Sequence, residues 1–174
     1  MARSHPRRRL RLALILMLLL AGAVVATAAD FPRKAAVFDF ELIDTSFGGN
    51  PGSGSPAEQK RLRLISDLLR RKLAESGAYV LVDTAPVMKA VKAAVYLHGC
   101  NGCEADIARS LGAELAFTGT VQKVSNLILI INLDVRDVAT EKRIMAYSVH
   151  IRGNTDTTWS RGVSYIVRNR LLPR

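Results

Sequence analysis

The strongest constraint on the fold is a set of three long strand-like segments in the second half of this 174-residue chain. They cover residues 115–124, 127–138 and 143–152 and are rich in β-branched and other apolar residues. Only short polar turns separate them, at residues 125–126 and 139–142. Connections this short join antiparallel neighbours and leave no room for a crossover. The sequence therefore predicts an antiparallel meander of these three strands.

The first part of the chain alternates strand-like and helix-like segments. Residues 35–43 (AAVFDFELI) alternate in polarity with a period of two, which predicts one strand with one buried face. Residues 55–58 (SPAE) match a capping box with proline at the first helical position, and apolar residues follow at helical spacing up to Gly77. Between them, residues 44–55 are rich in glycine and serine, so we expect a flexible loop there.

The remaining segments complete an α/β pattern. We expect a strand over residues 79–82, helices over 85–95 and 104–111, and a last helix capped by Thr155 or Asp156. The order β-α-β-α-α-β-β-β-α predicts a mixed sheet, with early strands joined by helical crossovers and late strands forming the meander. Residues 30–174 are enough for one hydrophobic core. We therefore expect a single secreted α/β domain.

Residues 1–29 have the composition of an export signal. Five arginines and an apolar run over residues 12–25 precede small residues that offer a cleavage pattern. We expect a mature periplasmic protein that begins at Ala29 or Asp30. The alternative is a membrane anchor, but the run is shorter than the roughly 20 residues that span a bilayer. No cysteine lies near the cleavage region to carry a lipid, so we expect no stable membrane anchor.

The formal net charge of +10 overstates the charge of the predicted domain. Five of the 25 Lys and Arg residues lie in residues 1–29, and none of the 15 Asp and Glu residues do, which leaves a charge of about +5. The basic residues are scattered among acidic ones, as is typical of a solvated surface. We therefore expect no nucleic-acid partner.

Both cysteines lie in the segment His98-Gly99-Cys100-Asn101-Gly102-Cys103, just before a predicted helix. In an oxidising compartment, two thiols so placed tend to form a disulfide, which we expect to be structural. Two alternatives stay open. One is a redox couple, in which the helix N-terminus favours the Cys100 thiolate. The other is a metal site of His98, Cys100 and Cys103, a ligand set suited to copper or zinc.

The other motifs do not point to catalysis. Asp39, Glu41 and Asp44 gather near the end of the first predicted strand, but carboxylates two positions apart are typical of the wet face of a half-buried strand. The glycine-rich residues 48–55 join a strand to a helix as a phosphate loop does, yet they lack its Gly-Lys-Ser/Thr ending. We therefore predict neither an enzymatic activity nor a cofactor.

Residues 127–131 (LILII) are apolar on both faces of their predicted strand. Either helices of this chain cover both faces, or one face meets a partner. Ile128 and Ile130 are the candidate interface residues, through which the protein would self-associate or bind another protein.

Residues 36–41 (AVFDFE), 76–83 (SGAYVLVD) and 108–120 (ARSLGAELAFTGT) follow one another in an order that resembles the TolB amino-terminal domain and the CsgG and LpoB envelope proteins. The whole chain, including the segment from Cys100 to Cys103, also resembles a group of secreted bacterial proteins of domain-of-unknown-function type. The wider resemblance implies a protein that binds other envelope proteins without catalysis. We therefore expect a periplasmic binding or assembly protein; the alternative is a thiol-redox or metal-handling accessory protein.

Overall fold

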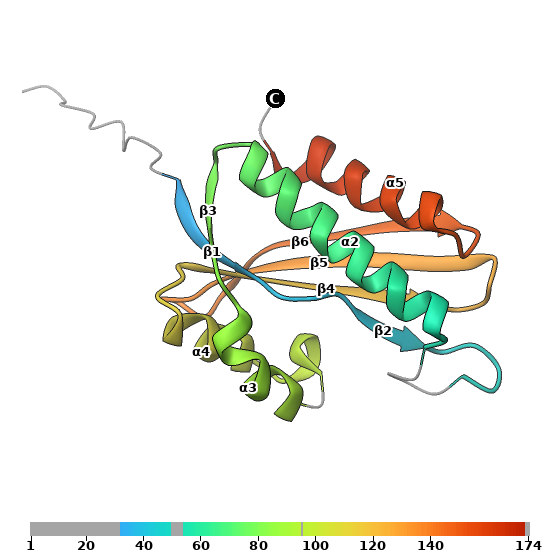
Figure 1. Ribbon diagram of the computed structural model, residues 1–174, viewed down its shortest axis with the longest axis horizontal. Helices are drawn as coiled ribbons and strands as arrows, with labels where there is room; N and C mark the ends of the chain where they lie inside the picture. Colours follow the sequence, from blue (N-terminus) through green and yellow to red (C-terminus); the bar gives the residue numbers. More distant parts are fainter. Residues whose placement is uncertain (1–31, 50–53, 95, 173–174) are drawn as a thin grey trace, which may run out of the picture.

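The computed structural model describes residues 32–49, 54–94 and 96–172, so the expected export signal lies outside the described residues. At its centre is a six-stranded sheet in the order β3-β1-β4-β5-β6, with β2 beside β4 (Figure 1). The strands are β1 (Arg33–Val37), β2 (Glu41–Asp44), β3 (Tyr79–Val82), β4 (Leu115–Lys123), β5 (Ile128–Asp137) and β6 (Arg143–Arg152). The pairs β1 with β3, β1 with β4 and β2 with β4 are parallel, whereas β4, β5 and β6 are antiparallel. The predicted mixed sheet and the late meander are confirmed.

In the described part of the chain, four α-helices lie on the two faces of this sheet. They are α2 (Pro56–Glu75), α3 (Met88–Ala93), α4 (Cys103–Ser110) and α5 (Asp156–Ile166). Helices α2 and α5 cover one face, and the shorter α3 and α4 lie on the other (Figure 1). The helix predicted over residues 85–95 is shorter than expected, because a 3₁₀ turn occupies Ala85–Val87 and α3 ends at Ala93.

The start of α2 follows its sequence signature. Ser55 Oγ accepts a hydrogen bond from the Glu58 amide at 3.3 Å, and the Ser55 amide donates to Glu58 Oε2 at 2.8 Å. These two bonds satisfy amides that a helix N-terminus leaves without partners. The apolar positions of α2 then face the main core, which also holds the fully buried Trp159 of α5. The predicted capping box is confirmed.

The prediction of one continuous strand over residues 35–43 is wrong, because a bulge divides it into β1 and β2. Val37 pairs with Phe117 and Glu41 pairs with Thr120, so four steps along this chain segment oppose three steps along β4. The extra residue reverses the alternation. Phe38 therefore packs with α3 and α4, whereas Phe40 packs in the main core under α2. Simple alternation had put both rings on one face.

The second face of the sheet is covered only in part. The apolar residues of α3 and α4 pack with those of β1 and β4, and α4 reaches β5 through the ion pair of Glu104 with Arg136. On β5, Leu129 and Ile131 are fully buried on the α2 and α5 side, whereas Ile130 on the other side is half-buried and Ile128 is 48% exposed. We call the uncovered part of this second face, formed by β2, β4, β5 and β6, the open face.

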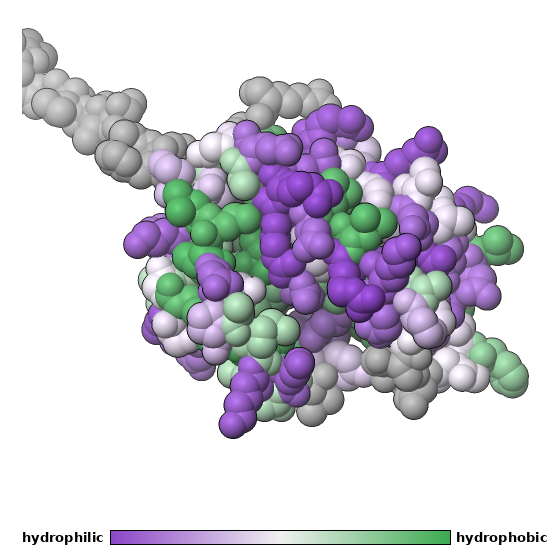
Figure 2. All heavy atoms as spheres, viewed as in Figure 1, coloured by the Kyte–Doolittle hydropathy of each residue, from purple (hydrophilic) through white to green (hydrophobic). Residues whose placement is uncertain are grey.

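The polarity of the outer surface differs between the helix α2 and the edge strand β3. Figure 2 shows hydrophilic side chains over the outer side of α2 and a group of apolar side chains over β3, the short edge strand. Among the described residues, no helix combines the length and the apolar character that crossing a bilayer requires.

Candidate functional site

The two cysteines lie in a short loop that leads into α4. A 3₁₀ turn at Leu97–Gly99 is followed by Cys100, by two residues with positive φ (Asn101 at 56° and Gly102 at 116°), and by Cys103 as the first residue of α4. Glycine tolerates this left-handed backbone at no steric cost, and asparagine tolerates it better than most residues. The structure joins Cys100 and Cys103 through their sulfur atoms, with their Cα atoms 5.6 Å apart.

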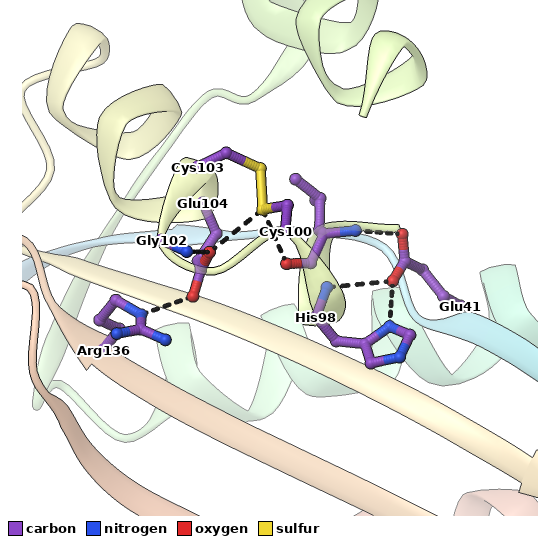
Figure 3. Close-up of a disulfide and its surroundings, with 8 residues drawn as sticks. Glu41, His98, Cys100, Gly102, Cys103, Glu104 and Arg136 are labelled. Atoms are coloured by element: carbon purple, nitrogen blue, oxygen red, sulfur yellow. Dashed lines mark hydrogen bonds and ion pairs between the residues drawn. A yellow bond between two sulfur atoms is a disulfide. The ribbon is translucent and has the colours of Figure 1, made fainter. Parts of the chain in front are cut away.

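Glu104 is a buried carboxylate beside the cysteines (Figure 3). It is 4% exposed, its Oε2 accepts a hydrogen bond from the Gly102 amide at 3.1 Å, and its Oε1 forms an ion pair with Arg136 of β5. The same Oε2 lies 3.4 Å from Cys100 Sγ. Glu104 thus ties the loop to the sheet. An acidic residue in the first turn of α4 was its only sequence signal, since the contact with Arg136 depends on the tertiary fold.

Glu41 of β2 holds the other side of the loop. Its carboxylate accepts hydrogen bonds from the Leu97 amide at 2.9 Å and the His98 amide at 3.3 Å, and its Oε2 lies 2.8 Å from His98 Nδ1. The imidazole therefore lies against Glu41 (Figure 3). Among the described residues, the group whose ligand atoms converge is Cys100, Cys103 and Glu104, without His98. The structure does not bring the predicted set of His98, Cys100 and Cys103 together.

A polar pocket of about 310 Å³ lies on the open face, and His98 forms part of its wall. At its centre, Asn132 Nδ2 donates to Thr120 Oγ1 at 3.2 Å, and Ser148 Oγ donates to Asn132 Oδ1 at 2.6 Å. Asp134 and Arg143 add a pair of opposite charges 3.5 Å apart. The remaining lining residues are Ile43, Thr118 and Ala146. The pocket thus offers neutral donors and acceptors, and both signs of charge, next to the anchored loop.

The sequence analysis missed this pocket, although its polar residues do leave a signal. Thr118 and Thr120 alternate on β4, and Asn132 and Asp134 alternate on β5. The strand register places Thr118 beside Asp134 and Thr120 beside Asn132. Writing out the register of the predicted meander would have grouped them on one face.

The three carboxylates near the first strand do not form one cluster. Asp39 pairs with Arg70 at 2.7 Å, Glu41 binds the 97–98 turn, and Asp44 pairs with Lys123 at 3.1 Å. Burial alone would raise the pKa of Asp44, but hydrogen bonds from Ser46 and Lys123 lower it. Each carboxylate therefore has a structural partner of its own.

Residues 33–171 match the model of the family DUF3280, described as "Protein of unknown function (DUF2380)". The chain belongs to this family. The expected membership of a domain-of-unknown-function family is confirmed. Among curated proteins, the sequence has no match.

Solved structures share the fold at low sequence identity. The LpoB C-terminal domain from Escherichia coli is 16% identical and aligns with a TM-score of 0.51, over 77% of this chain and 93% of that one. Lipoprotein GNA1162 from Neisseria meningitidis is 16% identical, with a TM-score of 0.50 over 78% and 96% of the two chains. A PelC variant dodecamer from Paraburkholderia phytofirmans is 13% identical, with a TM-score of 0.50 over 79% and 87%. These similarities show a common fold and confirm the expected resemblance to LpoB.

Proposed function

We propose that this protein is a non-enzymatic binding or assembly component of the bacterial envelope, located in the periplasm, and that it binds another envelope protein through its open face. One observation carries the proposal: among the described residues, no helix covers β5 and β6 on the open face, which ends in exposed apolar residues. Leu127 is 73% exposed and Ile128 is 48% exposed, while Ile130 leads from them toward the polar pocket. An apolar patch beside hydrogen-bonding groups is typical of protein interfaces.

The comparisons support a binding role at the level of the fold. The LpoB domain and the lipoprotein GNA1162 have the same architecture, and PelC with this architecture forms a dodecamer. The fold therefore suits assembly with other chains. The export signal expected in residues 1–29 supports a periplasmic location.

We propose further that Cys100 and Cys103 form a structural disulfide that fixes the edge of the open face. The buried Glu104 carboxylate close to Cys100 Sγ disfavours a thiolate at this position, which opposes thiol exchange. A redox midpoint below about −300 mV, measured by alkylation and intact mass, is the expected result. A midpoint between about −200 and −120 mV would support the redox alternative, and a metal mass lost on chelation would support the metal-handling one.

Site-specific photo-crosslinking in living cells tests the binding role. A photoreactive amino acid at Ile130 or Ile43 lies on the open face, whereas one at the exposed Lys60 of α2 lies on the opposite side of the sheet. We expect Ile130 and Ile43 to give the same discrete adduct, identified by mass spectrometry as one envelope protein, and Lys60 to give none. Adducts of equal yield from all three positions would contradict the proposal. An adduct of twice the chain mass would assign the open face to self-association instead.

A further inference from the structure

Strand β6 forms a long edge of the sheet. It runs for 10 residues, and within the described part of the chain β5 is the only strand that pairs with it. Its outer backbone groups are therefore available to an additional strand. Long unpaired edges are sites at which extended peptides add to a sheet.

A groove of about 610 Å³ runs between β6 and α5. Val149 and Ile151 of β6 supply apolar lining, and Tyr165 of α5, 43% exposed, borders the groove. Gly162 allows α5 to lie close to the sheet, since a Cβ there would lie 2.7 Å from Ile131 Cδ1 and 3.0 Å from Ile151 Cγ2. The groove thus provides an apolar seat beside the edge.

Three arginines that line this groove are unpaired. Across the described residues, no hydrogen bond or ion pair is found for the side chains of Arg152, Arg161 and Arg168. By contrast, three arginines on the other face of the sheet have an acidic partner: Arg109, Arg136 and Arg143 each pair with a carboxylate. A groove with three uncompensated positive charges and no acidic lining residue favours an anionic partner.

We propose that β6 and this groove bind an extended acidic segment of another protein. The segment would pair with the edge of β6 through its backbone, place an apolar side chain against Val149 and Ile151, and direct carboxylates to the three arginines. A second copy of this chain is a poor occupant. The sequence of β6 (RIMAYSVHIR) has no acidic residue, and antiparallel pairing of two such strands brings arginines together.

Peptide binding to the purified protein, followed by fluorescence anisotropy, tests the proposal. The probe is a ten-residue peptide with threonine at every second position; the positions between them, which would all face α5, carry valine and glutamate in turn. We expect it to bind, to weaken as salt is raised, and to lose at least tenfold in affinity to the variant Arg161→Glu/Arg168→Glu. The matched control is Lys89→Glu/Lys92→Glu, which makes the same charge change at exposed positions of α3 on the other side of the sheet. This control is expected to bind as the unchanged protein does.

Two further probes separate charge from strand addition. A peptide with lysine in place of glutamate, and the acidic peptide with every backbone nitrogen methylated, are both expected not to bind. Amide hydrogen exchange is expected to slow in β6 when the acidic peptide is bound. Equal binding of the methylated peptide, or protection outside β6, would overturn the proposal. Arginine-dependent binding to phosphatidylglycerol vesicles without peptide binding would overturn it in favour of a lipid surface.

Discussion

The carboxylate of Glu58 links separate elements of the fold, and its pKa lies well below the usual value. Its side chain is almost fully buried, and Lys123 Nζ lies 2.9 Å from Glu58 Oε1 and 3.1 Å from Asp44 Oδ2. Asn154 and Ser55 also donate hydrogen bonds to Glu58. Burial alone would raise the pKa of Glu58, but these bonds outweigh it and lower the pKa from 4.5 to about 2. The network thus joins α2 to β2, β4 and the loop before α5.

This network predicts a loss of stability in acid. Because the pKa of Glu58 is lower in the folded protein, its contribution is complete above about pH 4.5 and disappears as the pH falls toward 2. The shift corresponds to a free energy of the order of 3 kcal/mol. We expect Glu58→Gln to lower the free energy of unfolding in urea by about that amount at pH 7 and to flatten its dependence on pH below 4.5.

The exposed Glu75, at the last position of the same helix, gives the matched control. Glu75→Gln is expected to leave both the stability at pH 7 and the acid branch almost unchanged. Equal effects of the two substitutions would show that the buried network contributes no more than surface charge.

At the scale of elements, the chain just after the bulge that separates β1 from β2 brings one aromatic ring against one glycine. Phe40 is 3% exposed, its amide donates to Ser66 Oγ at 2.9 Å, and its ring lies over Gly119 of β4. A Cβ at Gly119 would lie 2.3 Å from Phe40 Cε1. The sheet therefore has no room for a side chain at this position.

We predict that Gly119→Ala destabilises the protein by about 1–3 kcal/mol, because the buried ring must move. The double variant Gly119→Ala/Phe40→Leu is expected to show a favourable coupling energy in a double-mutant cycle, since leucine removes the ring that clashes. Urea unfolding of the four proteins measures this coupling. Strictly additive effects would mean that the two residues do not meet.

At the scale of the whole molecule, the two faces of β5 differ in burial. Leu129 and Ile131 are fully buried between the sheet and the helices α2 and α5. Ile128 and Ile130 lie on the open face. We expect the variant Ile128→Thr/Ile130→Thr to keep a cooperative thermal transition. In this variant, a photoreactive amino acid at Ile43, a second position on the open face, is expected to give no crosslinked adduct. Surface substitutions usually change stability by little, whereas polar substitutions in a core are costly.

The neighbouring pair in the same strand provides the comparison. Leu129→Thr/Ile131→Thr makes the same kind of change on the covered side, and we expect it to abolish the cooperative transition seen by circular dichroism. If the Ile128 and Ile130 variant also fails to fold, or if it retains the partner, the open face is not the binding surface.

The sequence predicted most elements that depend on local signals. The cap at residues 55–58, the meander over β4 to β6 and the last helix capped by Thr155 are confirmed. Each rests on neighbours in the chain or on short turns. The bulge after Val37 was missed because it lies in the register of β1 and β2 against β4, a strand far away in sequence. The polar pocket was missed for a related reason, since its residues come from four strands and a helical turn.

The sequence by itself determined the fold class, the strand-like character of the meander and the closeness of Cys100 to Cys103. Periodicity, capping and spacing act within a few residues, so a single chain segment is sufficient to show them. Only the tertiary structure decided that Glu41 and Glu104 anchor the cysteine loop, that His98 lies against Glu41, and that helices cover one face and only part of the other. Those features depend on contacts between side chains that are distant in sequence, and local sequence patterns do not specify such contacts.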